Sequence, residues 1–174
     1  MVDTHSKIFF SETEVREIPT GLRPIVITDN FSTPENIGHI IRLAANIGAL
    51  KVIVLGDNSL RASKIRKTAG TSFDHIPVEF IATEELSAHI PEGYTLTALE
   101  TASGAENLFT TNLPDKMALI LGNEKYGISA ELLNMSGKII FIPMPGPIKS
   151  MNVSHAAAVC LFCWMGQVNT IDYK

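Results

Sequence analysis

The chain has 174 residues, of which 45% are hydrophobic and 18% are charged, and this composition is typical of one globular domain with a substantial core. Its formal net charge of −4 excludes a global electrostatic attraction to nucleic acid, so any affinity for RNA has to come from a local basic patch. The apolar runs are far shorter than the roughly 20 residues of a membrane span, and the first residues contain no signal-peptide core. We therefore expect a cytoplasmic protein without a membrane segment.

The first half of the chain alternates between strand and helix patterns. Residues 23–29 have the continuous apolar character of a buried strand, and residues 32–49 follow with apolar side chains at helical spacing. Ser32 or Thr33 is suited to cap this helix, Pro34 suits its first turn, and Gly48 is expected to close it. The pattern then predicts a buried strand at 51–56, a basic helix at about 61–68, a short strand at 77–81 and a small helix at 83–90.

The second half continues the alternation. Residues 94–100 and 116–122 predict strands, and after a loop at 123–127 the pattern predicts a helix at 129–135, a strand at 138–144 and a last helix at about 152–167. Apolar strands separated by helices indicate an α/β protein with a mostly parallel sheet and helices on both faces. We expect residues 21–174 to form this domain and residues 1–20 to be an N-terminal extension that packs on the domain or on a partner.

Two cysteines, Cys160 and Cys163, form a C-x-x-C pattern inside the apolar last helix. A redox pair or half of a zinc site is one interpretation. A redox C-x-x-C normally opens a helix and a structural zinc needs four ligands, so buried packing on one helix face is the favoured interpretation. We predict no metal site.

Three segments follow strands of the predicted sheet, at the edge where ligands bind in parallel sheets. In the first, Asn36 and Gly38 lie in the first helical turn, and Arg42 stands in an apolar stripe, where it either has a function or simply reaches solvent. In the second, Gly122 ends a strand and is followed by Asn123 and Glu124. A plain polar turn with a helix cap at Ser129 would also explain this second segment, and it lacks the spacing of a phosphate loop.

The third segment is the most specific of the three. Three prolines and a glycine between Pro143 and Pro147 prevent both helix and strand, so this loop has a stiff course. Ser150, Asn152 and Ser154 then crowd the start of the last helix. Capping explains one of these polar residues, Asn152 or Ser150, but does not require all three.

Together the stretches NIGHIIR, LGNEKYGIS and IPMPGPIKSMNVSHAAA resemble, in order, the three motifs of the SpoU branch of the SPOUT superfamily, the RNA ribose 2′-O-methyltransferases. The resemblance runs from Asn36 to about Ala158. It implies an α/β fold with a deep C-terminal trefoil knot, which no periodicity argument would predict. It also implies transfer of a methyl group from S-adenosylmethionine to a ribose 2′-hydroxyl of structured RNA.

The resemblance also implies roles for individual residues. The catalytic set comprises Arg42, Asn36, Glu124, Ser150 and Asn152. The set that holds S-adenosylmethionine comprises Leu121, Gly122, Asn123, Ile142, Met144, Met151 and Asn152. Two roles for Arg42 remain open, since a guanidinium is rarely neutral: it either acts as the base, or stays charged and orients the 2′-oxygen.

The resemblance further implies a homodimer through the apolar C-terminal helix, with Ala156–Ala158, Val159, Leu161, Phe162 and Trp164 available for burial. The RNA contacts expected from the sequence are Arg42 and the basic cluster, which we define as Arg61, Lys64, Arg66 and Lys67. Such a cluster is by default a solvated helix face. Because the chain is compact, the expected RNA is a tRNA, with rRNA as the second possibility.

Two other functions are compatible with parts of the sequence. A non-catalytic RNA-binding protein could retain the fold, although the complete set of motif residues counts against it. A dinucleotide-dependent enzyme is disfavoured because no G-x-G-x-x-G follows a strand. His39 and His155 lie near the first and third motifs and are expected on helix surfaces rather than in the chemistry.

Overall fold

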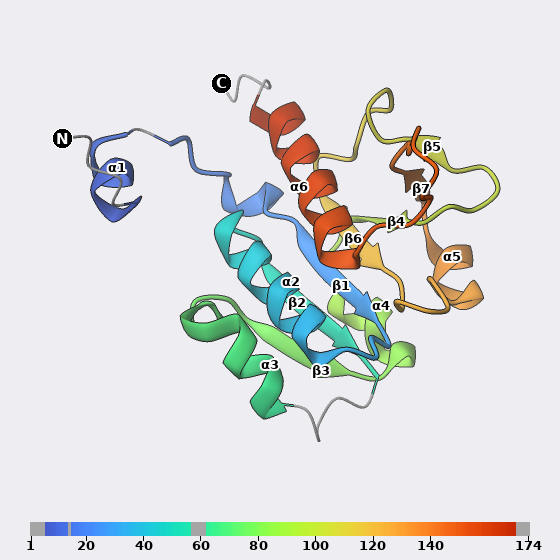
Figure 1. Ribbon diagram of the computed structural model, residues 1–174, viewed down its shortest axis with the longest axis horizontal. Helices are drawn as coiled ribbons and strands as arrows, with labels where there is room; N and C mark the ends of the chain where they lie inside the picture. Colours follow the sequence, from blue (N-terminus) through green and yellow to red (C-terminus); the bar gives the residue numbers. More distant parts are fainter. Residues whose placement is uncertain (1–5, 14, 57–61, 170–174) are drawn as a thin grey trace.

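The computed structural model describes residues 6–13, 15–56 and 62–169. Within these residues the chain forms one sheet of seven strands, in the order β3-β2-β1-β6-β4-β7-β5 (Figure 1). The strands are β1 Ile25–Asp29, β2 Lys51–Leu55, β3 Val78–Ile81, β4 Thr95–Leu99, β5 Glu106–Asn107, β6 Met117–Leu121 and β7 Lys138–Phe141. All six pairings are parallel, which confirms and sharpens the expected mostly parallel sheet.

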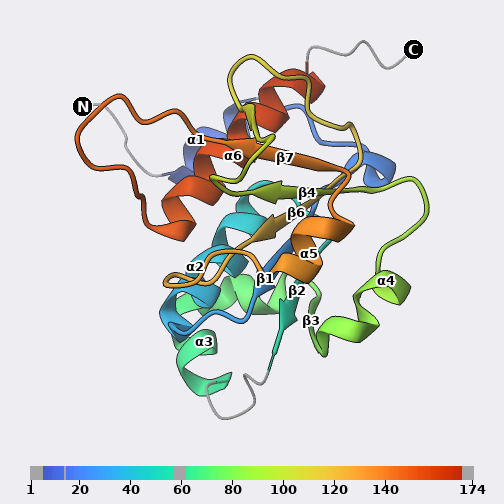
Figure 2. The ribbon, with the colours of Figure 1, turned by 90° about the vertical axis from the view of Figure 1, so that its right-hand side faces the viewer.

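Helices cover both faces of the sheet, as the sequence predicted (Figure 2). On one face lie α2 Pro34–Asn46, α3 Ala62–Ala69 and α6 Val153–Asn169, and on the other lie α4 Leu86–His89 and α5 Ala130–Met135. Each face has its own apolar cluster, and α6 contributes Trp164 to the first cluster whereas α5 contributes Leu132 to the second. The central strands β1 and β6 are buried along their whole length because both faces are covered. The knot itself stays a prediction.

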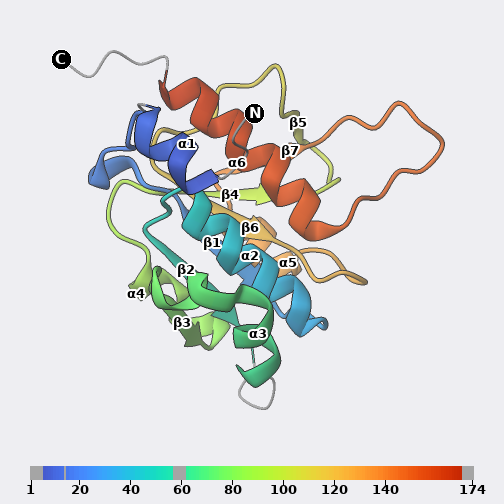
Figure 3. The ribbon, with the colours of Figure 1, turned by 60° about the vertical axis from the view of Figure 1, so that its left-hand side comes forward.

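The close packing of α2 on α3, visible in Figure 3, depends on the small residue Gly38. A Cβ atom at this position would lie 2.5 Å from the Cβ of Thr68 and 2.9 Å from the carbonyl oxygen of Ile65. The second of these atoms belongs to the backbone, so the contact cannot be relieved by a side-chain rotation. The two helices would have to move apart.

We predict that Gly38→Ala lowers the free energy of unfolding by about 1–3 kcal/mol, the usual cost of overpacking a core. Denaturant titration checks this. Asn46→Ala, at an exposed position of the same helix, is the control and should leave stability within about 0.5 kcal/mol. A Gly38→Ala protein as stable as the native one would contradict the close packing of α2 on α3.

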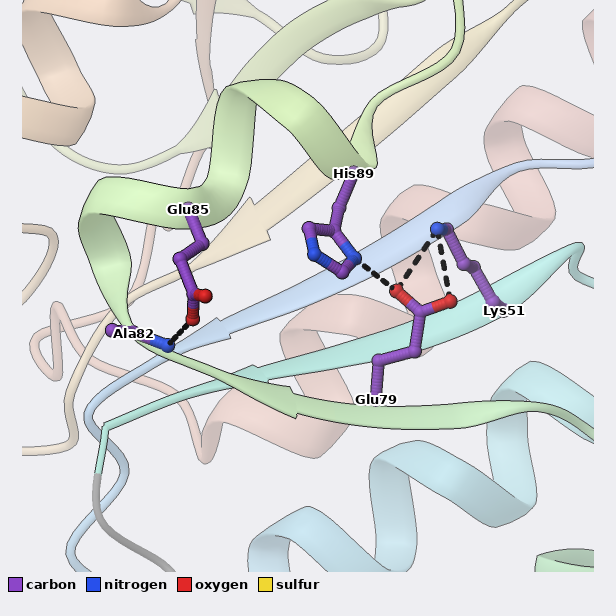
Figure 4. A network of polar contacts seen from close by, with 5 residues as sticks. All are labelled: Lys51, Glu79, Ala82, Glu85 and His89. Atoms are coloured by element: carbon purple, nitrogen blue, oxygen red, sulfur yellow. Dashed lines mark hydrogen bonds and ion pairs between the residues drawn. The ribbon is translucent and has the colours of Figure 1, made fainter.

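A polar network on the other face fixes the start of α4 and the outer strands (Figure 4). The carboxylate of Glu79 on β3 accepts hydrogen bonds from Lys51 of β2 at 3.0 and 3.1 Å, and it lies 2.8 Å from Nδ1 of His89. Partial burial raises the pKa of Glu79, but the bonds from His89 and Lys51 outweigh it and lower the pKa overall. Glu85 also accepts the backbone N–H of Ala82 at 2.9 Å, which caps the turn before α4.

The N-terminal segment forms a short helix, α1 Ser6–Glu12, which lies apart from the sheet in Figure 1. Its residues Ile8, Phe9 and Phe10 are exposed, and the two phenylalanine rings make an edge-to-face contact at 5.3 Å. Ile18, by contrast, belongs to the core beneath α2 and α6. The expected packing of the extension on the domain therefore applies to Ile18, while packing of α1 on a partner stays a prediction.

The two cysteines of α6 are free and pack as the favoured interpretation expected. Cys160 is buried and Cys163 is half-buried. Burial, together with the neighbouring Cys163, raises the pKa of Cys160 to about 12, so its thiol stays protonated and unreactive at neutral pH. Within the described residues no group of His, Cys, Asp or Glu is arranged to hold a metal ion. The described helices also include none long and apolar enough to cross a bilayer.

Candidate active site

Three loops meet at the carboxyl ends of the central strands. They follow β1 at residues 30–33, β6 at residues 122–129 and β7 at residues 142–152, and Figure 2 shows the first two lying close together. These are the three segments that the sequence singled out. Their convergence follows from parallel pairing, since β6 pairs with β1 and β4, β4 pairs with β7, and the carboxyl ends of parallel strands share one edge.

The carboxylate of Glu124 joins the second loop to the start of α2. Its oxygens accept hydrogen bonds from the backbone N–H of Ser32 at 2.8 Å and of Thr33 at 3.1 Å, and from the hydroxyl of Ser32 at 2.8 Å. Thr33 is the residue that precedes the helix, yet its side chain makes no capping hydrogen bond. The prediction that Ser32 or Thr33 caps α2 through its own side chain is therefore wrong for Thr33. The carboxylate of Glu124 instead holds Ser32 and Thr33, the two residues before the helix, and it lies near the favourable end of the helix dipole.

Asn36 carries this connection on to the third loop. Its side-chain N–H donates to Glu124 at 2.8 Å, and its side-chain oxygen accepts a hydrogen bond from the amide of Asn152 at 3.2 Å. Asn36 is only 7% exposed, so both halves of its amide are satisfied inside the protein. The chain Glu124, Asn36, Asn152 links all three motifs through three side chains, and we call it the motif network.

Asn152 also caps the last helix. Its side-chain oxygen accepts the backbone N–H of Ser154 at 2.8 Å and the hydroxyl of Ser154 at 2.6 Å. This decides between the two capping candidates in favour of Asn152. A cap at Ser129 belonged to the alternative interpretation of the second segment as a plain polar turn, and the side chain of Ser129 makes no capping bond to α5. Instead Asp29, at the end of β1, accepts the backbone N–H of Ser129 at 2.7 Å.

The hydrogen bonds to Glu124 keep this carboxylate charged. Partial burial raises the pKa of Glu124, but the hydrogen bonds from Asn36 and Ser32 outweigh this effect and lower the pKa to about 2. A carboxylate with this pKa does not accept a proton at neutral pH. Its contribution is therefore positioning and a fixed negative charge, and it is unsuited to be the base of a reaction.

A pocket of about 450 Å³ lies beside the motif network, within the size range of small-molecule sites. All seven residues predicted to hold the cofactor line it, as do Glu124 and Ser150 from the predicted catalytic set. The lining is formed by Leu99, Glu100, Thr101, Leu121–Glu124, Gly127, Phe141, Ile142, Met144, Lys149–Val153 and Ala156. Leu121 and Ile142 supply apolar walls, and Asn123, Glu124 and Asn152 supply polar groups at the rim.

Glycine at position 122 is required by the neighbouring backbone. A Cβ atom there would lie 2.4 Å from both the carbonyl carbon of Gly127 and the nitrogen of Ile128. The loop between these residues folds back on the end of β6 at this point. The close approach that requires glycine at position 122 is thus made by the protein's own backbone.

Glu100 and Thr101 are among the pocket residues that the sequence analysis missed. Glu100 follows β4 and accepts the backbone N–H groups of Thr101 at 2.8 Å and Ile128 at 3.0 Å, so it fastens β4 to the loop after β6. Both Glu100 and Thr101 line the pocket. The signal was present, because a carboxylate at the carboxyl end of a strand in a parallel sheet is placed like Glu124.

Arg42 lies outside the pocket lining of the single chain. It is exposed on α2, on the stripe that also carries Glu35, His39 and Asn46, while Asn36 faces the motif network. Among the described residues Arg42 makes no hydrogen bond or ion pair. Its side chain is thus available to an external group, and the structure does not bring it together with the rest of the predicted catalytic set. His39 and His155 lie on helix surfaces, as expected.

The basic cluster is only partly available. Lys64 and Lys67 are exposed on α3, whereas Arg66 is paired with Asp74 and stacks over the ring of Phe73 at 4.7 Å. Arg61 lies outside the described residues. In the described part of the cluster, Lys64 and Lys67 are therefore the cations without an ion pair, and contact of the cluster with RNA stays a prediction.

An all-parallel α/β sheet with a pocket at the carboxyl ends of its strands, bordered by the motif network, defines the structural class of this protein. Comparison with known proteins then gives the family. The model of the SpoU rRNA Methylase family matches residues 23–162, and the chain belongs to this family.

Several relatives are close enough for direct comparison. The chain is 32% identical over 151 residues to the 23S rRNA (guanosine-2′-O-)-methyltransferase RlmB of Xanthomonas axonopodis pv. citri, which covers 84% of this chain and 59% of the relative. It is 33% identical over 147 residues to the RlmB of Xylella fastidiosa, which covers 82% of this chain and 58% of the relative. The chain thus spans less than two thirds of the length of these curated relatives.

Solved structures agree with this assignment. The AdoMet-bound rRNA methyltransferase from Sinorhizobium meliloti matches with a TM-score of 0.77 and 25% identity, over 89% of this chain and 62% of that one. The TrmH/SpoU tRNA modifying enzyme of A. aeolicus matches with a TM-score of 0.75 and 24% identity, over 86% and 79% of the two chains. At 24% identity, the similarity to the A. aeolicus enzyme shows the fold alone. The fold is that of the SpoU methyltransferases.

Proposed function

We propose that this protein transfers a methyl group from S-adenosylmethionine to the 2′-hydroxyl of a ribose in RNA. The observation that carries the proposal is the motif network, which joins the three family motifs at the rim of one pocket. Membership of the SpoU family and the activity named for its curated relatives support it.

The pocket suits this cofactor in size and in chemistry. Leu121, Ile142 and Met144 offer apolar surface for a base and a thioether, and the rim offers carboxylates and amides for amino and hydroxyl groups. Gly122 and the loop after β7 would hold the cofactor largely through backbone. S-adenosylmethionine supplies a methyl group on a positively charged sulfur, which a weak nucleophile can attack once its proton is removed.

The chain's own contribution is alignment and charge. A ribose hydroxyl has to lie in line with the methyl group and lose its proton near the moment of attack. Glu124 and Asn36 fix the start of α2, and Asn152 fixes the start of α6, so the two helices that border the site are set relative to each other. Arg42 would act on the 2′-oxygen either as the proton acceptor or as a charged group that stabilises the developing negative charge.

Because Arg42 lies outside the pocket of the single chain, this role requires RNA or a second copy of the chain to complete the site. We propose a homodimer through α6. This helix presents Phe162, 49% exposed, on its outer side with Ala158 and Val159 beside it. Ala157, Leu161 and Trp164 are buried within the chain and are not available to a partner, so the predicted dimer face is narrower than the sequence suggested.

Phe162→Glu is expected to convert the dimer to a monomer, because a carboxylate in an apolar interface cannot be desolvated without a partner charge. Sedimentation velocity checks this. Phe80→Glu is the matched control, since Phe80 is 41% exposed and lies on the edge strand β3. A native protein that is monomeric, or a Phe162→Glu protein that stays dimeric, would contradict the proposed interface.

Among RNA classes, ribosomal RNA has the better support. The curated relatives act on 23S rRNA, whereas the expectation of tRNA rested on the compactness of the chain. The structural neighbour named as a tRNA modifying enzyme supports the fold alone. We propose that Lys64 and Lys67 contact RNA phosphates, and that dimerisation doubles this weak patch.

The experiment that tests the function has two parts. Calorimetry of the purified protein with S-adenosylmethionine is expected to show binding. Mass spectrometry of nucleosides from rRNA and tRNA of a strain that lacks the protein is expected to show loss of one 2′-O-methylated nucleoside. RNA binding without cofactor binding would favour the non-catalytic RNA-binding alternative, and persistence of every such nucleoside in strains without redundant enzymes would contradict the proposed activity.

A further inference from the structure

The tip of the loop after β6 presents an aromatic side chain to solvent. Tyr126 is 77% exposed, the highest value for any large hydrophobic side chain in the described part of the chain. It follows Glu124 by two residues, and the loop residues Asn123, Glu124 and Gly127 line the pocket. Tyr126 therefore belongs to the loop that forms one wall of the pocket, although its own ring does not line the pocket.

The loop that carries Tyr126 is held in one conformation. Asn123 and Gly127 exchange two backbone hydrogen bonds at 3.0 and 2.9 Å, which close the loop at its base. The side-chain oxygen of Asn123 accepts the backbone N–H groups of Lys125 at 2.9 Å and Tyr126 at 3.2 Å. Gly127 takes a φ of +72°, which favours glycine and completes the turn. The aromatic ring is displayed on a fixed backbone rather than on a loose loop.

A cation accompanies the ring. The ammonium of Lys125 lies 5.1 Å from the centroid of the Tyr126 ring, and Lys125 itself is exposed. The Tyr126 hydroxyl makes no hydrogen bond within the described residues, so no such bond accounts for the exposed position of this ring. An exposed aromatic face beside a cation is the chemistry that binds unpaired nucleotides, through stacking on the base and attraction to the phosphate.

We infer that Tyr126 stacks on an unpaired base of the RNA next to the target ribose, while Lys125 moves from the ring to a neighbouring phosphate. The inference rests on the proposed function, since it takes RNA as the substrate. It adds that the target nucleotide, or the one beside it, lies in a single-stranded loop or bulge. A fully paired helix could not offer the face of a base to the ring.

Fluorescence tests this directly. The chain has a single tryptophan, Trp164, which is buried and donates to the carbonyl oxygen of Pro114, so it should not respond to RNA. A Tyr126→Trp protein places a second indole at the loop tip. Oligoadenylate of about 15 nucleotides should quench this added emission, and an abasic oligomer with the same number of phosphates should not. Equal quenching by both oligomers, or no quenching by oligoadenylate, would overturn the inference.

Binding measurements separate stacking from charge. Tyr126→Ala should weaken oligoadenylate binding about 10-fold or more, and Tyr126→Phe should retain it, because the ring and not the hydroxyl makes the contact. Lys125→Ala should reduce the slope of log affinity against log salt by about one, which Tyr126→Ala should leave unchanged. Phe109→Ala removes an exposed ring elsewhere and should have no effect. A Tyr126→Ala protein with native affinity would refute stacking.

These readouts do not depend on methyl transfer. If calorimetry shows that the native protein does not bind S-adenosylmethionine, the proposed activity fails, and the quenching of Tyr126→Trp still decides the stacking inference. If transfer occurs but quenching does not, the activity stands and the role of Tyr126 is wrong.

Discussion

Arg42→Ala is expected to lower the rate of methyl transfer about 100-fold or more while leaving S-adenosylmethionine binding and the oligomeric state unchanged. The size follows from the two roles open to this residue, since loss of a positioned proton acceptor or of an electrostatic stabiliser each costs about 100-fold. Cofactor binding should persist because Arg42 lies outside the pocket lining. Single-turnover transfer to RNA, with calorimetry beside it, measures both quantities.

Two further variants identify the role and control for the helix surface. Arg42→Lys keeps the positive charge but loses the planar fork, so partial activity would indicate an electrostatic role, and none would indicate that the fork is required. Asn46→Ala changes the same exposed stripe of α2 one turn later and should have native activity. An Arg42→Ala protein with native activity would remove Arg42 from the mechanism, and with it the main reason to expect a site shared between copies.

Glu124→Gln should impair both activity and stability. The carboxylate is surrounded by hydrogen-bond donors, which are the backbone N–H groups of Ser32 and Thr33 and the side-chain amide of Asn36. The NH₂ group of a glutamine would place a further donor against these donors. The start of α2 would shift at the rim of the pocket, and a displacement of about 1 Å can cost 100-fold in rate. Because the carboxylate is partly exposed, the loss of unfolding free energy should be only about 1 kcal/mol.

The same variant has a defined dependence on pH. The pKa of Glu124 falls from an ordinary value of 4.5 to about 2 in the folded protein, so its contribution to stability is present above 4.5 and is lost as the pH falls through 2. The difference in unfolding free energy between the native and Glu124→Gln proteins should therefore shrink as the pH falls from 4.5 towards 2. Denaturant titrations across this range measure it.

Glu35→Gln is the matched control for that series. Glu35 is an exposed carboxylate in the first turn of α2 and makes no hydrogen bond within the described residues. Its replacement should leave the pH profile close to that of the native protein. A constant stability difference for Glu124→Gln between pH 4.5 and 2 would show that the carboxylate is not held charged by its neighbours.

Much of the fold could be predicted from hydrophobic patterns, because strands buried on both faces and helices buried on one face leave different periodicities. The central strands β1, β2 and β6 and the helices α2 and α6 were located to within a few residues. The edge strand β5 was missed, since its two residues, Glu106 and Asn107, have no apolar pattern and pair only along β7. Edge pairing of this kind depends on tertiary placement, which local sequence does not encode.

The sequence predicted many residues of the site but not the hydrogen bonds that connect them. The residues of the pocket could be identified because each motif follows a strand and resembles a family motif. A capping bond from the Thr33 side chain was wrongly predicted because local rules favour the nearest hydroxyl. The residues before α2 are instead held by the carboxylate of Glu124, from 91 or 92 residues away, through charge-assisted bonds. The sequence analysis placed Arg42 in an apolar stripe, and this was wrong, because the structure places it on the exposed stripe of α2. Its catalytic role stays a prediction.

The bond between Asn36 and Asn152 spans 116 residues of sequence. During translation, β1 and α2 leave the ribosome long before the residues that complete their polar partners, and at about 5–20 residues per second the wait is on the order of ten seconds. Throughout that interval the amide of Asn36 has to be satisfied by water, and the face of α2 that α6 will cover is open. The pocket of a nascent chain is thus incomplete until the last helix has been synthesised. We expect a chaperone to protect the nascent chain most during this period.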